Sequence, residues 1–273
     1  MFDKFFHKTL YLPYRLFLRT IKKTKEPRAT VVLLHGIAST NKLWDNINVD
    51  VPDDINILAV DLLGHGESPK PSWEGAQTLK SQARALRRAL RATKNLSRPV
   101  FLVGHSLGSL VAAEFAKMYP SSVDFVVMVS PPIYLQDEDV ENTWSREALL
   151  KDNYQYLIKN REVASKVAEL ATRDVIRGAN QIKTEQDLDL MTETLDLSIL
   201  RQDTFRVLED TSTKTHIIYG LFDPLVIGKN IRELESVNPN ISVTVIPTAH
   251  DITDFAAKFV VESINENLTR SKK

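Results

Sequence analysis

The stretch FLVGHSLGSL, residues 101–110, places a serine between two glycines where an apolar run ends. The residues before Gly104 are typical of a buried strand, and those from Leu107 onward have the apolar spacing of a helix. Ser106 therefore lies where a strand turns sharply into a helix, which is the setting of a nucleophile elbow. Such a turn has no room for side chains at its flanks, and the helix N-terminus beside it favours developing negative charge. The alternative is a purely structural turn in which Ser106 has no catalytic role. The other motifs of the chain decide between these two interpretations.

Short runs rich in β-branched residues recur along the chain and are almost continuously apolar. Such runs are typical of strands buried on both faces of a parallel sheet. Segments with helical spacing lie between them, so we predict an α/β fold with a mostly parallel, doubly wound sheet. The predicted strands are Val31–Leu34, Ile55–Val60, Val100–Val103, Phe125–Val129, His216–Tyr219 and Val243–Ile246, with Tyr14–Thr20 as an additional early strand.

The alternation breaks between about residues 131 and 213, where no convincing strand occurs. Three stretches there have helical patterns, and a segment this helical is not a long loop. We therefore predict a core domain made of residues 1–130 and 214–273, with residues 131–213 inserted between two core strands as a helical cap. The three stretches are SREALLKDNYQYLIKN (145–160), REVASKVAELATRDVIR (161–177) and EQDLDLMTETLDLSILRQDTFRVLED (185–210).

Composition excludes several kinds of protein. Lys plus Arg equals Asp plus Glu, at 35 each, and a neutral chain is not typical of a nucleic-acid-binding protein. The arginines of the predicted helix at residues 79–91 are therefore interpreted as a solvated face. The absence of cysteine excludes disulfides, thiolate catalysis and zinc–cysteine sites. Metal-ligand spacing and a dinucleotide fingerprint are also absent, since DLLGHGES (61–68) contains only Gly-x-Gly, so we predict no cofactor.

The first 25 residues have neither the apolar region nor the small-residue cleavage site of a signal peptide. No apolar run reaches the roughly 18 residues of a membrane span. We therefore expect a soluble, cytoplasmic protein with no stable membrane insertion, either a monomer or a homodimer. Phe2, Phe5, Phe6 and Leu10 line one face of a predicted short helix, with Lys4 and Lys8 beside it. Packing of this face on the body is favoured over attachment to a membrane surface.

A serine hydroxyl needs a base, and the base needs an acid that orients it. His250 follows the last predicted strand, so it lies at the same edge of the sheet as Ser106, whereas His35 and His65 are expected to pack loops. Asp223 directly follows the penultimate predicted strand and is the favoured acid. The rival acids are Asp251 and Asp254, which begin the last helix where carboxylates commonly cap, and Asp137 in the insertion.

Negative charge that develops on the substrate oxygen needs two hydrogen-bond donors. The backbone N–H of Leu107 directly follows the serine and is the first candidate. The second is the N–H of Ile37, in the loop LHGIAST (34–40) that follows the strand at Val31–Leu34. Gly36 allows this loop to approach the serine, and a backbone donor does not depend on the side chain it belongs to.

These motifs together resemble the α/β-hydrolase superfamily in its capped serine-hydrolase form. The resemblance is carried, in order along most of the core, by LLHG (33–36), DLLGHGES (61–68), GHSLGS (104–109), GLFDP (220–224) and AHD (249–251). Ser109 and Ala249 stand where relatives often have glycine, and neither puts the triad in doubt. The order Ser106, Asp223, His250 is the order expected of this superfamily.

The resemblance implies acyl transfer in two steps on a small-molecule acyl substrate, with no metal or organic cofactor. Ser106 attacks, His250 takes its proton, Asp223 orients the imidazole, and the N–H groups of Ile37 and Leu107 bind the oxyanion. A carboxylesterase is the leading interpretation, and thioesterases, lactonases, amidases and carbon–carbon-bond hydrolases with the same triad stay open. A non-catalytic ligand-binding protein on this fold is the alternative from another class.

Overall fold

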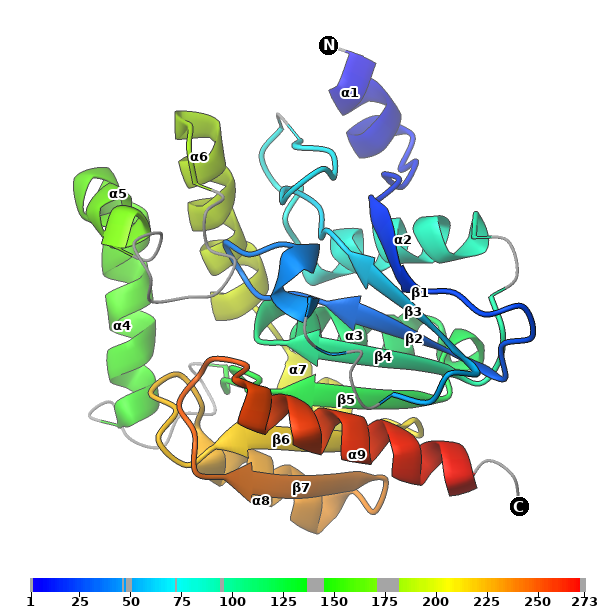
Figure 1. Cartoon of the computed structure of the whole chain (residues 1–273). Coiled ribbons are helices and arrows are strands. Elements are labelled where there is room, and N and C mark those ends of the chain that lie inside the picture. The colour runs from blue at the N-terminus through cyan, green and yellow to red at the C-terminus, as the bar shows by residue number, and fades with distance from the viewer. Residues whose placement is uncertain are drawn as a thin grey trace.

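The computed structural model describes residues 2–45, 47, 51–71, 73–93, 96–136, 145–170 and 182–270. Seven strands form one sheet in the order β1-β3-β2-β4-β5-β6-β7 (Figure 1). Only the β1–β3 pair is antiparallel among these described strands, so the predicted mostly parallel α/β fold is confirmed. The strands are β1 (Leu18–Lys22), β2 (Ala29–Leu34), β3 (Ile55–Val60), β4 (Val100–His105), β5 (Phe125–Val129), β6 (Lys214–Gly220) and β7 (Ile241–Ile246).

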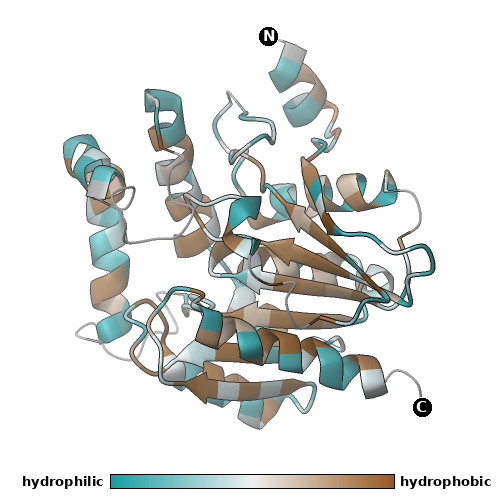
Figure 2. Ribbon diagram, viewed as in Figure 1, coloured by the Kyte–Doolittle hydropathy of each residue, from teal (hydrophilic) through white to brown (hydrophobic). Residues whose placement is uncertain are grey.

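The central strands bury both of their faces, because side chains alternate between two helical layers. In β2, Val32 and Leu34 join one apolar cluster, while Val31 and Leu33 join the other. The strands are accordingly continuously hydrophobic along their length (Figure 2). The first layer contains α2 (Leu79–Arg91), α3 (Leu107–Met118), α7 (Thr204–Glu209) and α8 (Gly228–Val237); the second contains η2 (Asn41–Trp44) and α9 (Asp254–Arg270).

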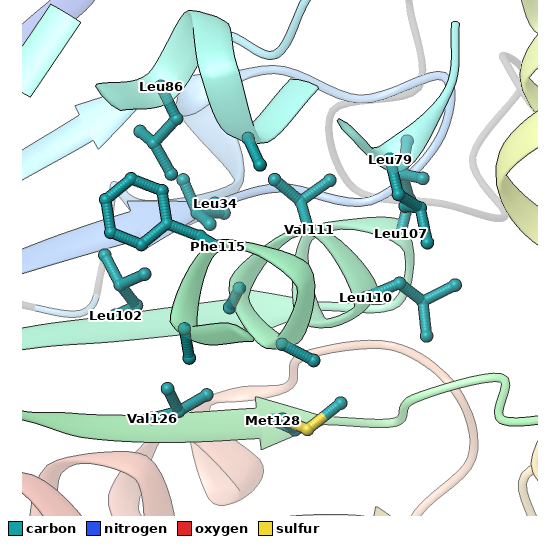
Figure 3. Packing of buried hydrophobic residues seen from close by; sticks show 14 of the residues in the cluster. Leu34, Leu79, Leu86, Leu102, Leu107, Leu110, Val111, Phe115, Val126 and Met128 are labelled. Carbon is teal, nitrogen blue, oxygen red and sulfur yellow. The ribbon is translucent and has the colours of Figure 1, made fainter. Parts of the chain in front are cut away.

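Helix α3 is the most deeply buried helix of the first layer and connects the serine turn to the core. Leu107, Val111 and Phe115 lie between α2 and the strands, opposite Leu34 and Leu102 (Figure 3). None of these five side chains is measurably exposed. The residue that follows Ser106 is therefore fixed by packing, which holds the start of the helix in one place.

The first three described helices between β5 and β6 stand at the carboxyl ends of the parallel strands, and the fourth, α7, lies behind the sheet (Figure 1). Polar contacts join them to the loop before α2: Lys70 Nζ lies 2.6 Å from Asp187 Oδ1, and Ala76 N–H donates to Glu193 at 3.1 Å. Leu195 and Ile199 are buried in the main apolar cluster. The elements are α4 (Arg146–Lys159), α5 (Arg161–Leu170), α6 (Glu185–Thr194), the π-helical turn η6 (Leu195–Leu200) and then α7.

The helical pattern over residues 185–210 is divided into three elements rather than one helix. The first break is the π-helical turn, and the second is the short segment before α7. Gln202 explains the second break, because its buried side-chain amide donates to the carbonyl oxygens of Pro132, at 2.6 Å, and Ile199, at 3.0 Å. This residue ties the chain back to the core at the place where helical hydrogen bonding stops.

The N-terminal region differs from the sequence prediction. The early strand begins at Leu18 instead of Tyr14, and directly before it the backbone N–H of Phe17 donates to the hydroxyl of Ser68 at 2.9 Å instead of to a strand. The Tyr14 hydroxyl bonds to the side chains of Asp3 and Trp73. The predicted short helix exists as α1 (Phe2–Lys4) and η1 (Phe5–Thr9), but the prediction that its apolar face packs on the body is wrong. Phe5, Phe6 and Leu10 are 51%, 42% and 49% exposed. In the described part of the chain, every helix is too short or too polar to cross a bilayer.

Candidate active site

Ser106 connects β4 to α3 with a strained backbone, at φ 50° and ψ −117°. Its N–H donates to the carbonyl oxygen of Val129 at 2.9 Å, which fixes the turn to the end of β5. A Cβ on Gly104 would lie 2.3 Å from the carbonyl carbon of Gly108, and one on Gly108 would lie 2.4 Å from the carbonyl oxygen of Leu34. Both positions therefore require glycine, and backbone strain of the kind found at Ser106 is common at functional sites.

The structure brings Asp223 and His250 together at the carboxyl ends of β6 and β7. The His250 Nδ1 lies 2.9 Å from Asp223 Oδ2 and 3.1 Å from Oδ1. Because an ionised carboxylate only accepts, Nδ1 carries the proton and Nε2 is left as the basic nitrogen. Among the described residues no hydrogen bond joins this imidazole to the Ser106 hydroxyl, a contact that often tightens only when substrate is bound.

The carboxyl group of Asp223 is held in its ionised form. Burial by itself raises the pKa of Asp223, which is 2% exposed, but hydrogen bonds outweigh burial and bring the pKa below its ordinary value. The donors are the His250 ring, the backbone N–H of Leu225 and the hydroxyl of Ser130. An ionised acid at this position stabilises an imidazolium on its partner.

Ser130 is a site residue that sequence reasoning missed. It follows β5 with a positive φ of 49°, and its N–H donates to the carbonyl oxygen of Ile218 at 2.8 Å. This conformation turns the hydroxyl toward Asp223 on the neighbouring strand. The only sequence signal is a serine directly after a buried strand. This signal points to a contact with Asp223 only once β5 is known to lie beside β6.

His105 also has a position that the sequence did not predict. Its Nε2 donates to the backbone carbonyl of His250 at 2.9 Å, and the two rings lie 5.0 Å apart. Burial lowers the pKa of His105 to about 3, so the ring is neutral at physiological pH. His105 therefore links the residue before the serine to the loop that presents the candidate base.

The loop after β2 lies against the serine turn, since a Cβ on Gly36 would be 3.2 Å from the Cβ of Ser106. Ala38 N–H donates to His65 Nε2 at 3.2 Å, which fixes the far side of the loop. The N–H groups of Ile37 and Leu107 have no acceptor among the described residues. Two free donors near the serine suit an oxyanion, which is the role predicted for them.

His35 and His65 hold the loops around the site, as the sequence predicts. His35 Nε2 accepts from Leu62 N–H at 3.0 Å, and its Nδ1 donates to the Gly36 carbonyl at 2.7 Å. Burial lowers the pKa of both histidines, that of His35 strongly. Each ring must be neutral, because one nitrogen accepts a backbone N–H.

These buried histidines predict that the protein loses stability in mild acid. The pKa of His35, His65 and His105 is below the ordinary value of 6.5, so the unfolded chain binds more protons than the folded chain below about pH 6.5. The free energy of unfolding should therefore fall as pH falls from 6.5 to 5, with an upper limit of about 1.4 kcal/mol per pH unit for a ring that stays neutral in the folded chain, as His105 does.

Urea unfolding at pH 7.5, 6.5, 5.8 and 5.0 measures this slope. Asp223 contributes little in that window, because a carboxyl group with a lowered pKa loses its stabilising effect only below about pH 4. A stability that is unchanged between pH 7.5 and 5.0 would contradict the neutral, buried state of these rings.

Two hollows adjoin the insertion. The larger, about 780 Å³, lies between α6, η6 and the loop residues Pro71 and Trp73–Gly75, and the smaller, about 470 Å³, includes Asp223 in its lining. Ser106 lines neither of them and is only 6% exposed. The larger hollow mixes apolar side chains such as Trp73 and Leu190 with charged ones such as Glu193.

The remaining candidate residues are placed as follows. Asp251 lies in the loop after His250, and Asp254 begins α9. Asp137 lies outside the described residues. No group of three His, Asp or Glu side chains suited to a metal ion occurs in the described part of the chain.

Several known proteins with similar sequences or structures carry hydrolase names. Residues 29–257 match the family model for the alpha/beta hydrolase fold. The probable lysophospholipase BODYGUARD 1 of Arabidopsis thaliana is 32% identical over 118 residues, which are 41% of this chain and 25% of the relative. BODYGUARD 2 of the same plant is 27% identical over 187 residues, 66% of this chain and 39% of the relative. The matched segment thus spans about a quarter to two fifths of these relatives.

A solved structure shares the fold along most of both chains. The esterase EaEST from Exiguobacterium antarcticum aligns with a TM-score of 0.71 at 16% identity, covering 93% of this chain and 95% of the esterase. At that identity the likeness concerns the arrangement of strands and helices.

Proposed function

The chain belongs to the family with the α/β-hydrolase fold, and we propose that it is a serine hydrolase acting on a carboxylic ester or a related acyl bond. One observation carries the proposal: the strained Ser106 turn and the Asp223–His250 pair lie at the same edge of one sheet. A serine, a base and an orienting acid at such an edge are the elements of nucleophilic acyl transfer.

The mechanism follows from the hydrogen bonds of these residues. His250 Nε2 takes the proton of Ser106 as the hydroxyl oxygen attacks the substrate carbonyl carbon. The oxygen of the tetrahedral intermediate becomes negative and accepts from the N–H groups of Ile37 and Leu107. His250 gives the proton to the leaving alcohol, and water, activated by the same imidazole, then releases the acid from Ser106.

Residues 131–213 act in this proposal as a cap that binds the acyl group of a small, largely apolar substrate. Support comes from one apolar cluster in which Leu107 packs with Leu195 and Ile199 of the insertion. Ile37 and Tyr154 are partly buried against the same cluster. An acyl group on Ser106 would meet apolar side chains from both the core and the cap. The names of the two plant relatives, which refer to lysophospholipids, agree with an ester of an apolar acyl chain.

Hydrolysis of p-nitrophenyl esters from acetyl to octanoyl tests the proposal. We expect kcat/KM to rise about fourfold for each methylene that becomes buried, since each contributes roughly 0.8 kcal/mol, and then to fall once the site is full. Absence of hydrolysis of every ester in the series would contradict the proposed activity. A response that does not change with acyl length would contradict the role of the cap.

Two neighbouring leucines of α4 provide a matched pair of variants. Leu150 is partly buried against the main apolar cluster, whereas Leu149 is 61% exposed. Leu150→Ala is expected to alter the way kcat/KM depends on acyl length. Leu149→Ala is expected to leave that dependence unchanged.

A further inference from the structure

The N-terminal segment presents apolar side chains to solvent. Five large apolar residues between Phe5 and Leu12 are between 42% and 73% exposed. In Figure 1 this segment stands away from the sheet at the N-terminal end of the drawn chain, above β1 and α2. Contiguous exposed apolar patches on soluble proteins commonly mark sites that bind a protein, a ligand or a membrane. We call Phe5, Phe6, Leu10, Tyr11 and Leu12 the apolar patch.

The segment is oriented by contacts on its other side. The His7 ring stacks on Tyr14 with centroids 3.6 Å apart, and Lys8 Nζ lies 5.6 Å from the centre of the Trp73 ring. Trp73 Nε1 in turn donates to the Tyr14 hydroxyl at 2.8 Å. These contacts hold the polar side of the segment against the body, so the apolar patch is directed outward.

A row of basic side chains lies beside the apolar patch. Helix α2 contains no acidic residue, and Lys80, Arg84 and Arg88 repeat at intervals of four on its exposed surface. Arg84 lines the same hollow as Tyr11 and Leu12, and Arg88 donates to the carbonyl oxygen of Pro13. Like charges four residues apart repel one another, so this arrangement favours an anionic partner.

Positive charge is concentrated in the N-terminal part of the chain, which carries the apolar patch. Residues 1–28 contain eight Lys and Arg and two acidic residues, although the whole chain is neutral. Arg19, Lys22 and Arg28 form ion pairs with the exposed aspartates Asp45, Asp53 and Asp54. Lys4 and Arg15 are exposed in the same region as the patch and add to the basic row.

We propose that the apolar patch and the basic face of α2 form one site that docks on the surface of an anionic lipid bilayer. The aromatic and leucine side chains would enter the boundary between headgroups and acyl chains, and Lys80, Arg84 and Arg88 would bind lipid phosphates. Stable attachment of this kind needs two signals, an apolar one and a basic one, and both are present here side by side.

A lipid surface fits the site better than a protein does. A stable protein partner buries about 800 Å² on each side of an interface, more than five partly exposed side chains supply. The row of like charges would also need a matching acidic surface, whereas an anionic bilayer supplies phosphates at every position. The inference does not rest on the proposed catalytic function, because binding to vesicles requires no turnover.

Sedimentation of the full chain with vesicles tests the site. We expect binding to vesicles of 30% phosphatidylglycerol in phosphatidylcholine in 0.1 M salt, and at least tenfold weaker binding to phosphatidylcholine alone or in 0.5 M salt. Phe5→Ser with Phe6→Ser should weaken binding at least tenfold, because each side chain loses its apolar burial. Lys80→Gln with Arg84→Gln should weaken it about tenfold and reduce the preference for the anionic lipid.

Matched controls carry the same changes elsewhere on the surface. Val237 and Val245 are exposed apolar residues of α8 and β7, at the opposite edge of the sheet, and Lys117 and Lys258 are exposed basic residues of α3 and α9. Val237→Ser with Val245→Ser and Lys117→Gln with Lys258→Gln should bind vesicles as the parent chain does. Unchanged thermal unfolding separates lost binding from lost folding.

Three results would overturn the inference. The parent chain would fail to bind anionic vesicles, or the patch variants and the controls would bind equally well. The third is a concentration-dependent dimer, seen by analytical ultracentrifugation without lipid, that the Phe5→Ser with Phe6→Ser variant dissociates. That result would assign the patch to a second copy of this chain.

Discussion

Replacing Ser106 by alanine is expected to lower kcat/KM for an activated aryl ester by about 10⁴-fold or more. The reason is chemical: alanine has no oxygen to form the acyl-enzyme, and the remaining N–H donors and imidazole supply only the residual rate. Rates of p-nitrophenyl ester hydrolysis by the two purified proteins measure the loss. Near-normal activity in the pure variant would assign the chemistry to another residue.

The fold should survive this substitution. Ser106 is buried at a turn whose shape depends on Gly104 and Gly108 and on the hydrogen bond from its own N–H to Val129, and alanine keeps that N–H. Circular dichroism and Tm should therefore match those of the parent chain. Ser109, three residues along the same helix, is the matched control, since its hydroxyl donates to the Ser106 carbonyl. Ser109→Ala should retain most of the activity.

A covalent probe provides a second readout for the same residue. A fluorophosphonate should label the parent chain at one peptide, the one containing Ser106, and should label neither the Ser106→Ala variant nor the unfolded chain. Labelling depends on an activated serine and not on the choice of ester, so it separates a wrong substrate from a wrong nucleophile. Labelling of a different serine would contradict the proposed mechanism.

Buried strands were the most predictable part of this fold. Ile55–Val60 and Phe125–Val129 have the same ends in the sequence prediction and in β3 and β5, because all of their residues except Asn56 are apolar and buried. Helix α8 was not predicted, since it begins at Gly228 without a side-chain cap and has only two buried apolar residues, Ile231 and Leu234. Two such positions are too few to reveal a helical period.

Contacts that depend on the order of strands in the sheet could not be predicted from the sequence. The positions of Asp223 and His250 after successive strands were enough to predict that they meet. The roles of Ser130 and His105 required the knowledge that β5 lies between β4 and β6. The direction of the N-terminal patch was predicted wrongly, because periodicity shows that Phe5 and Phe6 share a side of the chain without showing what that side faces.

Asp223→Asn is expected to lower kcat by about 10³- to 10⁴-fold, whereas Asp251→Asn should change it only a few-fold. Asp223 lies 2.9 Å from His250 Nδ1 and is ionised, so it fixes the tautomer that leaves Nε2 as the basic nitrogen. An asparagine amide offers a donor as well as an acceptor, so it permits the opposite tautomer, and it carries no charge to stabilise the imidazolium.

Asp251 is a suitable control for Asp223, because it follows the candidate base His250 in the sequence and also carries a carboxyl group. Both substitutions keep the size of the side chain and remove one negative charge, so a general electrostatic effect would appear in both. Fluorophosphonate labelling should slow in Asp223→Asn in parallel with kcat, while Tm reports any loss of packing around the buried side chain. Equal and mild effects of the two substitutions on kcat would mean that another residue orients His250. Asp137 of the insertion would then be the next residue to replace.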